Sequence, residues 1–145
     1  MGRYPLLVMI VLLGLSYLVD VFLPVSFGLA WIQWLGVALL LCGVSLLLAA
    51  AGLFRLRGTT VDPTKSPNKL VTDGIYRVSR NPMYLGMVWI LLGISLFLDS
   101  LVGLVFPVGF YVYMNWRVIP REEMTVESVF GEEFRDYKRR TRRWI

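Results

Sequence analysis

The sequence contains no histidine and only one cysteine, Cys42, among its 145 residues. The absence of histidine excludes a serine–histidine–aspartate triad, a histidine-ligated metal and a histidine general base. A single cysteine cannot form a disulfide within the chain, and we expect no metal site. Any chemistry here must therefore use carboxylates, arginines, tyrosines, backbone groups or a bound cofactor.

Positive charge is missing from long apolar stretches of the chain. All 15 lysines and arginines lie in three groups, which are Arg3, the 55–80 segment and the 117–143 segment. Hydrophobic residues make up 57% of the chain, well above the share in a soluble domain of this size. The sequence therefore predicts an all-α, polytopic membrane protein that forms a single domain over residues 1–145.

Four transmembrane helices are predicted, since about 20 apolar residues cross a bilayer. The expected elements are spans at 5–23, 31–54, 82–98 and 101–119 and an amphipathic C-terminal helix at 121–145. Basic residues favour the cytoplasmic side, so both termini and the 55–81 loop are predicted to be cytoplasmic. Asp20 and Asp99 then lie near the outer face. The basic groups border apolar spans, which favours anionic membrane lipids over nucleic acid as partners.

Several local features of the helices can also be predicted. Small residues recur at helical spacing in the second span and predict packing within the bundle: Ala38, Cys42, Ser45, Ala49 and Gly52. Asn81 and Pro82 suit the N-cap and first position of the third helix. We expect Pro107 to kink the fourth span, Pro120 to end it, and Gly131 to divide the tail.

A hairpin of the third and fourth spans brings two polar segments to one face. The third span starts at 80–86, and the fourth returns to the same face at 117–123. A helix start with nearby arginines favours a carboxylate, whereas Glu122 and Glu123 favour an ammonium or sulfonium group. Tyr84, Trp89 and Trp116 offer apolar faces for a flat ring. S-adenosylmethionine combines these three chemical features.

The stretch LVTDGIYRVSRNPMYLG, with REE one hairpin later and then FGEEFRDYKRRTRRWI, resembles the isoprenylcysteine carboxyl methyltransferase family, a relative of the membrane phospholipid N-methyltransferases. The resemblance covers roughly residues 58–145. It implies a cofactor site made by Gly74, Tyr76, Arg80, Asn81, Pro82, Tyr84, Leu85, Gly86, Glu122 and Glu123. The family's usual histidine is Asn81 here, so no imidazole proton is available at that position.

The resemblance implies an S-adenosylmethionine-dependent methyltransferase that modifies a membrane-embedded or apolar acceptor with a carboxylate, amine or thiol. Methyl transfer needs alignment and exclusion of water more than acid–base catalysis. The catalytic candidates are Arg77 and Arg121, which could position an acceptor carboxylate, together with Glu123. A four-helix transporter or a structural, lipid-binding bundle is the alternative. A transporter needs an ionisable residue deep in the membrane, and Asp20 lies near a helix end.

Overall fold

The computed structural model describes residues 4–58 and 69–145, so Arg3 and Lys65 of the basic groups lie outside the described residues. The helices are α1 (Pro5–Phe22), α2 (Ala30–Leu56), α3 (Pro82–Phe97), α4 (Val105–Tyr113), α5 (Ile119–Phe130) and α6 (Glu132–Arg140). Two 3-10 turns and one π turn accompany them, at Gly74–Arg77, Val102–Leu104 and Met114–Val118. The described residues contain no strand, which confirms the predicted all-α class.

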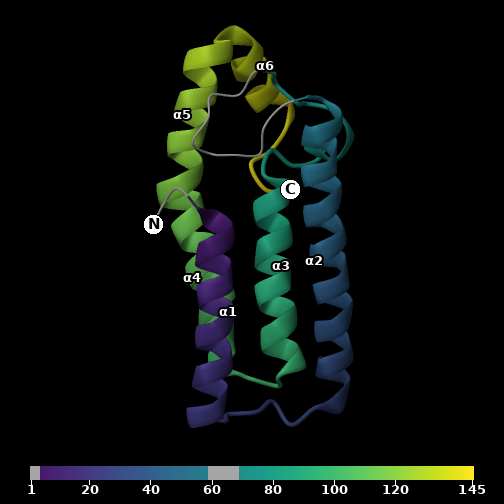
Figure 1. The fold of residues 1–145 in the computed structure, drawn as a ribbon, viewed down its shortest axis with the longest axis vertical. Helices are drawn as coiled ribbons and strands as arrows, with labels where there is room; N and C mark the ends of the chain where they lie inside the picture. Colours follow the sequence, from purple (N-terminus) through teal and green to yellow (C-terminus); the bar gives the residue numbers. More distant parts are fainter. Residues whose placement is uncertain (1–3, 59–68) are drawn as a thin grey trace.

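The central helix of the bundle is α3 (Figure 1). It packs against α2 on one side and against α1 and α4 on the other. Its buried Leu91 belongs to the same core as the fully buried Phe110 and Met114. By length and composition, α1, α2 and Val102–Phe130 can each cross a membrane, and α3 is a shorter apolar helix. The predicted bounds of the first three spans agree with the helices to within two residues.

Paired glycines line the contact between α2 and α3. A Cβ atom added at Gly36 would lie 2.5 Å from the amide nitrogen of Phe97, and one at Gly43 would lie 2.7 Å from the carbonyl oxygen of Gly86. A Cβ atom at Gly93 would lie 2.7 Å from the amide nitrogen of Leu40. Backbone therefore meets backbone, and this approach is possible only without side chains.

The predicted packing stripe of α2 is wrong. Four of its members are exposed and the last is half-buried: Ala38, Cys42, Ser45, Ala49 and Gly52. The buried face of α2 instead carries Gly36, Gly43 and Ala50. At the closest backbone contacts, the α2 residues are Gly36 and Gly43, which have no Cβ atom.

The sequence predicts that Pro120 ends the fourth helix, and this prediction is wrong, because the helix continues past Pro120. A 3-10 turn, α4, the π turn and α5 follow one another directly over Val102–Phe130. The amide of Ile119 donates to the carbonyl of Met114, five residues earlier, so the turn widens just before the proline. Pro120 is then the second residue of α5, where its missing N–H costs little. Pro107 is the third residue of α4, again in a first turn.

The turns at one end of the bundle, here called the far end, are tied together by Asp99. Its carboxylate accepts hydrogen bonds from the amides of Phe27 (3.1 Å) and Gly28 (3.4 Å). The amide of Leu101 also donates to the carbonyl of Val25 at 2.8 Å. The turn between α1 and α2 is therefore joined to the turn between α3 and α4.

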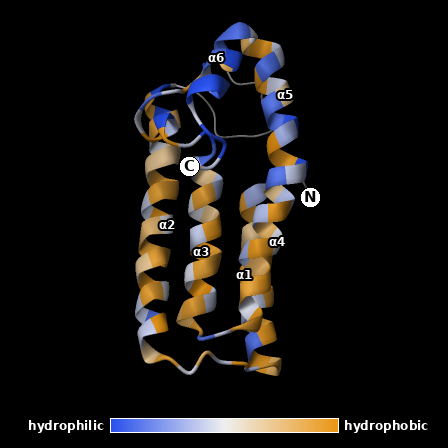
Figure 2. Ribbon diagram, turned by 180° about the vertical axis from the view of Figure 1, so that it is seen from behind, coloured by the Kyte–Doolittle hydropathy of each residue, from blue (hydrophilic) through white to orange (hydrophobic). Residues whose placement is uncertain are grey.

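The opposite end, here called the charged rim, carries the polar segments. Figure 2 shows hydrophilic residues gathered over α5, α6 and the nearby turns, and hydrophobic residues along the bundle. Gly131 has a φ of 53° and separates α5 from α6, as predicted. Phe134 and Tyr137 of α6 pack with Ala50, Val71 and Tyr76 in a small second core. Helix α6 thus folds back over the ends of α2 and α3 that lie at the charged rim.

Candidate functional site

Two polar segments far apart in the sequence meet at the charged rim. The hydroxyl of Tyr84, in the first turn of α3, donates to Glu122 Oε1 at 2.6 Å. The guanidinium of Arg80, just before α3, donates to Glu123 Oε1 at 2.8 Å. The predicted juxtaposition of the start of the third helix with the end of the fourth is therefore confirmed. Glu122 and Glu123 follow the apolar part of their helix, which ends at Ile119.

Glu123 is held between two guanidinium groups. Arg80 contacts Oε1 at 2.8 Å, and Arg143 contacts Oε2 at 2.7 Å. The side chains of Arg80 and Glu123 are only 11% and 12% exposed. Removal of Glu123 would leave the guanidinium of Arg80, which is only 11% exposed, without its anion, and this is destabilising. Glu123 is therefore committed to partners within the protein.

Glu122 differs from its neighbour. Its only hydrogen bond among the described residues is the one from Tyr84, and no described lysine or arginine nitrogen lies within 4.0 Å of its carboxylate. The side chain is half-buried, and its Oε2 atom accepts no hydrogen bond from the described part of the chain. One carboxylate oxygen at the rim thus remains able to accept a donor or a positive charge from a ligand.

The tail contributes residues that the sequence reasoning missed. Arg143 donates to the carbonyl and to Oδ1 of Asn115, both at 3.3 Å. The indole of Trp144 donates to the same Oδ1 at 3.0 Å, and its ring packs on Tyr111 with centroids 4.8 Å apart. Asn115 lies in the π turn, a feature that is frequent at functional sites. A lone asparagine among apolar residues was the available signal for it.

Some predicted site residues have structural roles. Gly86 faces Gly43, and an added Cβ atom would lie 2.8 Å from that residue's carbonyl oxygen. Tyr76 is 5% exposed, and its carbonyl accepts a hydrogen bond from the Tyr137 hydroxyl at 2.6 Å. Burial raises the pKa of Tyr137 to about 12 although the charge of Arg80 opposes the shift, so the hydroxyl stays a donor. Gly74 has a φ of 56° and begins the 3-10 turn.

Three further predicted site residues lie at the start of α3, which are Asn81, Pro82 and Leu85. Asn81 occupies the N-cap position, but its side chain makes no capping bond and instead donates to the carbonyl of Arg143 at 3.0 Å. Pro82 is the buried first residue of the helix, as predicted, and Leu85 is half-buried. The amide of Asn81 donates to Ser79 Oγ at 3.1 Å.

Arg77 and Arg121, the predicted acceptor-positioning residues, are exposed. Neither forms an ion pair with Glu122 or Glu123 in the described part of the structure. They lie on segments that border the rim but do not join the Arg80–Glu123–Arg143 network. Because both side chains are exposed, they remain available to contact an acceptor at the surface.

The donors and acceptors at the rim fit a ligand with both a carboxylate and a positive charge. The Nε atom of Arg80 is buried and has no hydrogen-bond partner among the described residues. The first amides of α3 lack acceptors within the helix and favour an anion. Glu122 offers the complementary negative charge. The methionine end of S-adenosylmethionine carries both groups, so these residues fit that cofactor.

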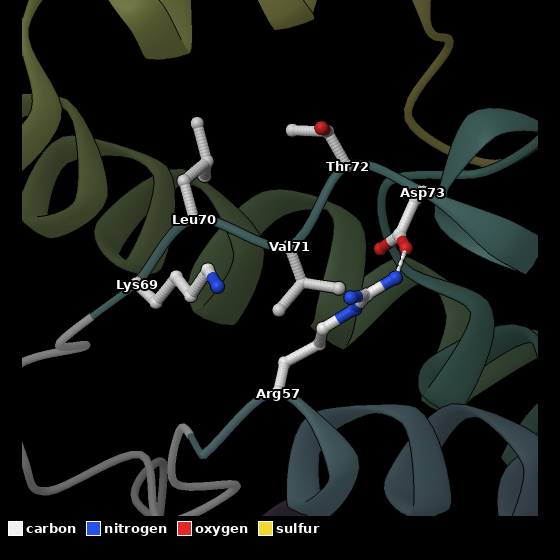
Figure 3. A pocket seen from close by; sticks show the side chains of 6 residues that line it. All are labelled: Arg57, Lys69, Leu70, Val71, Thr72 and Asp73. Carbon is white, nitrogen blue, oxygen red and sulfur yellow. Dashed lines mark hydrogen bonds and ion pairs between the residues drawn. The ribbon is translucent and has the colours of Figure 1, made fainter.

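A hollow of about 230 Å³ lies at the same end of the bundle, beside the end of α2 (Figure 3). It is lined by Arg57, Lys69, Leu70, Val71, Thr72 and Asp73. Arg57 and Asp73 form an ion pair across it, with both side chains more than 40% exposed. None of the predicted site residues lines this hollow, and exposed pairs of this kind contribute little to stability. We therefore locate the candidate site at the Tyr84–Glu122 and Arg80–Glu123 contacts and not in this hollow.

Comparison with known proteins identifies the family of the chain. The model of the phospholipid methyltransferase family matches residues 31–133, which is more than two thirds of the chain. The chain belongs to the phospholipid methyltransferase family. The match begins with α2 and so extends the family region beyond the segment that the sequence motifs had indicated.

Two known proteins are similar to parts of the chain. Mouse protein-S-isoprenylcysteine O-methyltransferase is 29% identical over 125 residues, which cover 83% of this chain and 44% of that protein. An uncharacterised Haemophilus influenzae protein is 40% identical over 63 residues, which cover 43% of this chain and all of that protein. The chain therefore spans less than half the length of the mouse relative.

The fold also resembles that of a solved structure. The eukaryotic intramembrane Ras methyltransferase (isoprenylcysteine carboxyl methyltransferase) superposes with a TM-score of 0.70 at 19% identity, covering 93% of this chain and 49% of that one. Together with the apolar helices, this likeness identifies the chain as a multi-pass integral membrane protein.

Proposed function

We propose that this protein is an S-adenosylmethionine-dependent methyltransferase that modifies an apolar acceptor in the membrane. Membership of the phospholipid methyltransferase family supports the reaction class. The observation that carries the proposal is the meeting of two motifs at the charged rim, where Tyr84 orients Glu122 at 2.6 Å and Arg80 neutralises Glu123 at 2.8 Å. A bundle with a purely structural role gives no reason for a carboxylate at this position that is incompletely paired among the described residues.

The cofactor, when bound, supplies an electrophilic methyl group on a sulfonium. In this proposal Glu122 contacts the positive charge of its methionine end, and the first amides of α3, next to the positive charge of Arg80, receive its carboxylate. Since an ionised carboxylate or thiolate acceptor needs no base, the chain's own task is to orient the reactants and to exclude water. Arg77 and Arg121 would hold an anionic acceptor at the surface.

The acceptor is proposed to be a lipid-like molecule whose reactive group reaches the rim from the bilayer. The mouse relative is named for methylation of protein isoprenylcysteine, and the family for methylation of phospholipids. The substrates in both names combine an apolar chain with a polar reactive end. The positive groups at the rim support a cytoplasmic location for the rim and, with it, for both termini and the 55–81 loop.

Calorimetric titration of the purified protein in detergent tests the cofactor assignment. We expect S-adenosylmethionine to bind the unmodified protein, and Tyr84→Ala to weaken binding because Glu122 loses its orienting hydroxyl. Transfer of a labelled methyl group to a membrane extract would then identify the acceptor. Absence of cofactor binding by protein with a cooperative unfolding transition would refute the proposal.

A further inference from the structure

The C-terminal segment Thr141–Ile145 lies along the start of α3. The carbonyl of Thr141 accepts from Arg80 Nη1 at 2.6 Å, and the carbonyl of Arg142 accepts from the Arg80 amide at 3.0 Å. The carbonyl of Arg143 accepts from the side-chain amide of Asn81 at 3.0 Å. Successive carbonyls of the segment are thus held by the motif that opens α3.

This backbone pairing places the Arg143 side chain between two elements. Its guanidinium reaches Glu123 on α5 and Asn115 in the π turn. Asn115 Oδ1 also accepts from Trp144, so one amide oxygen holds two consecutive residues of the tail. A guanidinium anchored by several bonds keeps its direction far better than a free side chain, because its fork geometry is fixed.

The two adjacent glutamates consequently have different environments. Successive side chains on a helix point about 100° apart, so Glu122 turns to Tyr84 while Glu123 turns to the arginines. Arg80 and Arg143 saturate both oxygens of Glu123. Both guanidinium groups pair with Glu123, and neither forms an ion pair with Glu122.

We propose that Arg143 is a positioning residue that locks Glu123 in a triad with Arg80 and thereby leaves Glu122 as the carboxylate that recognises the positive charge of the cofactor. This assignment rests on the proposed function and divides the roles of the two glutamates. Glu123 organises the rim, and Glu122 binds. Asn115 in the π turn and Trp144 in the tail support Arg143 and do not contact the ligand themselves.

Matched glutamine variants test the division of roles by calorimetric affinity for S-adenosylmethionine and by thermal unfolding. Glu122→Gln keeps an acceptor for Tyr84 but removes the charge, so we expect an unchanged unfolding temperature and affinity at least about tenfold weaker. Glu123→Gln leaves two arginines without their anion and should lower the unfolding temperature. Glu133→Gln, an exposed carboxylate on α6, is the control and should change neither.

Arg143 is tested at a temperature where each variant is folded. Arg143→Gln should weaken cofactor binding, and Arg143→Lys should restore part of the loss because Glu123 regains a cation. Unchanged affinity in folded Arg143→Gln would overturn the positioning role. Unchanged affinity in Glu122→Gln, while the unmodified protein binds, would overturn the division of roles alone. Failure of the unmodified protein to bind would instead refute the proposed function.

Discussion

The close contact between α2 and α3 predicts that one added methyl group at Gly36 destabilises the protein. In Gly36→Ala the new Cβ atom would lie 2.5 Å from the amide nitrogen of Phe97 and 2.7 Å from the carbonyl oxygen of Gly93. Both neighbours are backbone atoms and cannot rotate away. Reaching an ordinary contact of 3.4 Å from 2.5 Å requires the helices to separate locally by about 0.9 Å.

The cost can be estimated from two opposing effects. Overpacking of a well-packed contact costs about 1–3 kcal/mol, and a backbone clash belongs at the upper end. Replacing glycine by alanine in a helix returns up to about 1 kcal/mol. We therefore expect a net loss of about 2 kcal/mol, equivalent to a fall of about 4–8 °C in the unfolding temperature.

Thermal unfolding in detergent, followed by tryptophan fluorescence, measures this effect. Gly109→Ala is the matched control, because a Cβ atom there meets nothing within 4 Å and the exposed helix position gains propensity. The control should unfold at the same or a slightly higher temperature. If Gly36→Ala unfolds no earlier than Gly109→Ala, the backbone contact between α2 and α3 is not as close as described.

Two further predictions concern the tail and the topology. Tyr137→Phe should cost about 1–3 kcal/mol in chemical denaturation, because the Tyr76 carbonyl loses its partner. The pKa of Tyr137 rises to about 12 in the folded protein. The contribution of its hydroxyl to the free energy of unfolding should therefore be complete below pH about 10 and decline as the pH rises towards 12. Loss of this contribution below pH about 9 would contradict the prediction. Accessibility tags at position 65 and after Ile145 should both be cytoplasmic, and tags on opposite sides of the membrane would break the proposed orientation.

The spans and the meeting of the two motifs could be predicted from the sequence. Long uncharged runs have few other stable solutions than membrane helices, so their bounds follow closely from composition. A short turn at Asp99 then requires that α3 and the next helix run antiparallel. Tyr84 and Glu122 must therefore lie at the same end, whatever the details of packing.

The continuity of the helix past Pro120 could not be predicted in this way. A proline normally ends or kinks a helix, and only the widened turn at Met114–Val118 removes the conflict. Such a π turn has no periodic signal of its own, so the role of Asn115 was missed with it. The glycine contact was missed for a different reason, since spacing alone cannot say which of several small-residue faces meets a neighbour.

The tail residues of the site were also beyond prediction. The sequence predicts one amphipathic helix over 121–145, but α6 ends at Arg140 and residues 141–145 have no regular secondary structure. This last segment is held by carbonyl groups that every residue possesses, which leaves no mark in the sequence. The position of this segment is therefore set by tertiary hydrogen bonds, which composition does not reveal.

The tie made by Asp99 has a mechanical consequence for the whole molecule. Because the two turns are joined at the far end, the helices can separate only at the opposite end, the charged rim. We expect spontaneous fluctuations to be smallest beside Asp99 and to grow towards Glu122, so that molecules could come and go at one end while the other end remains shut.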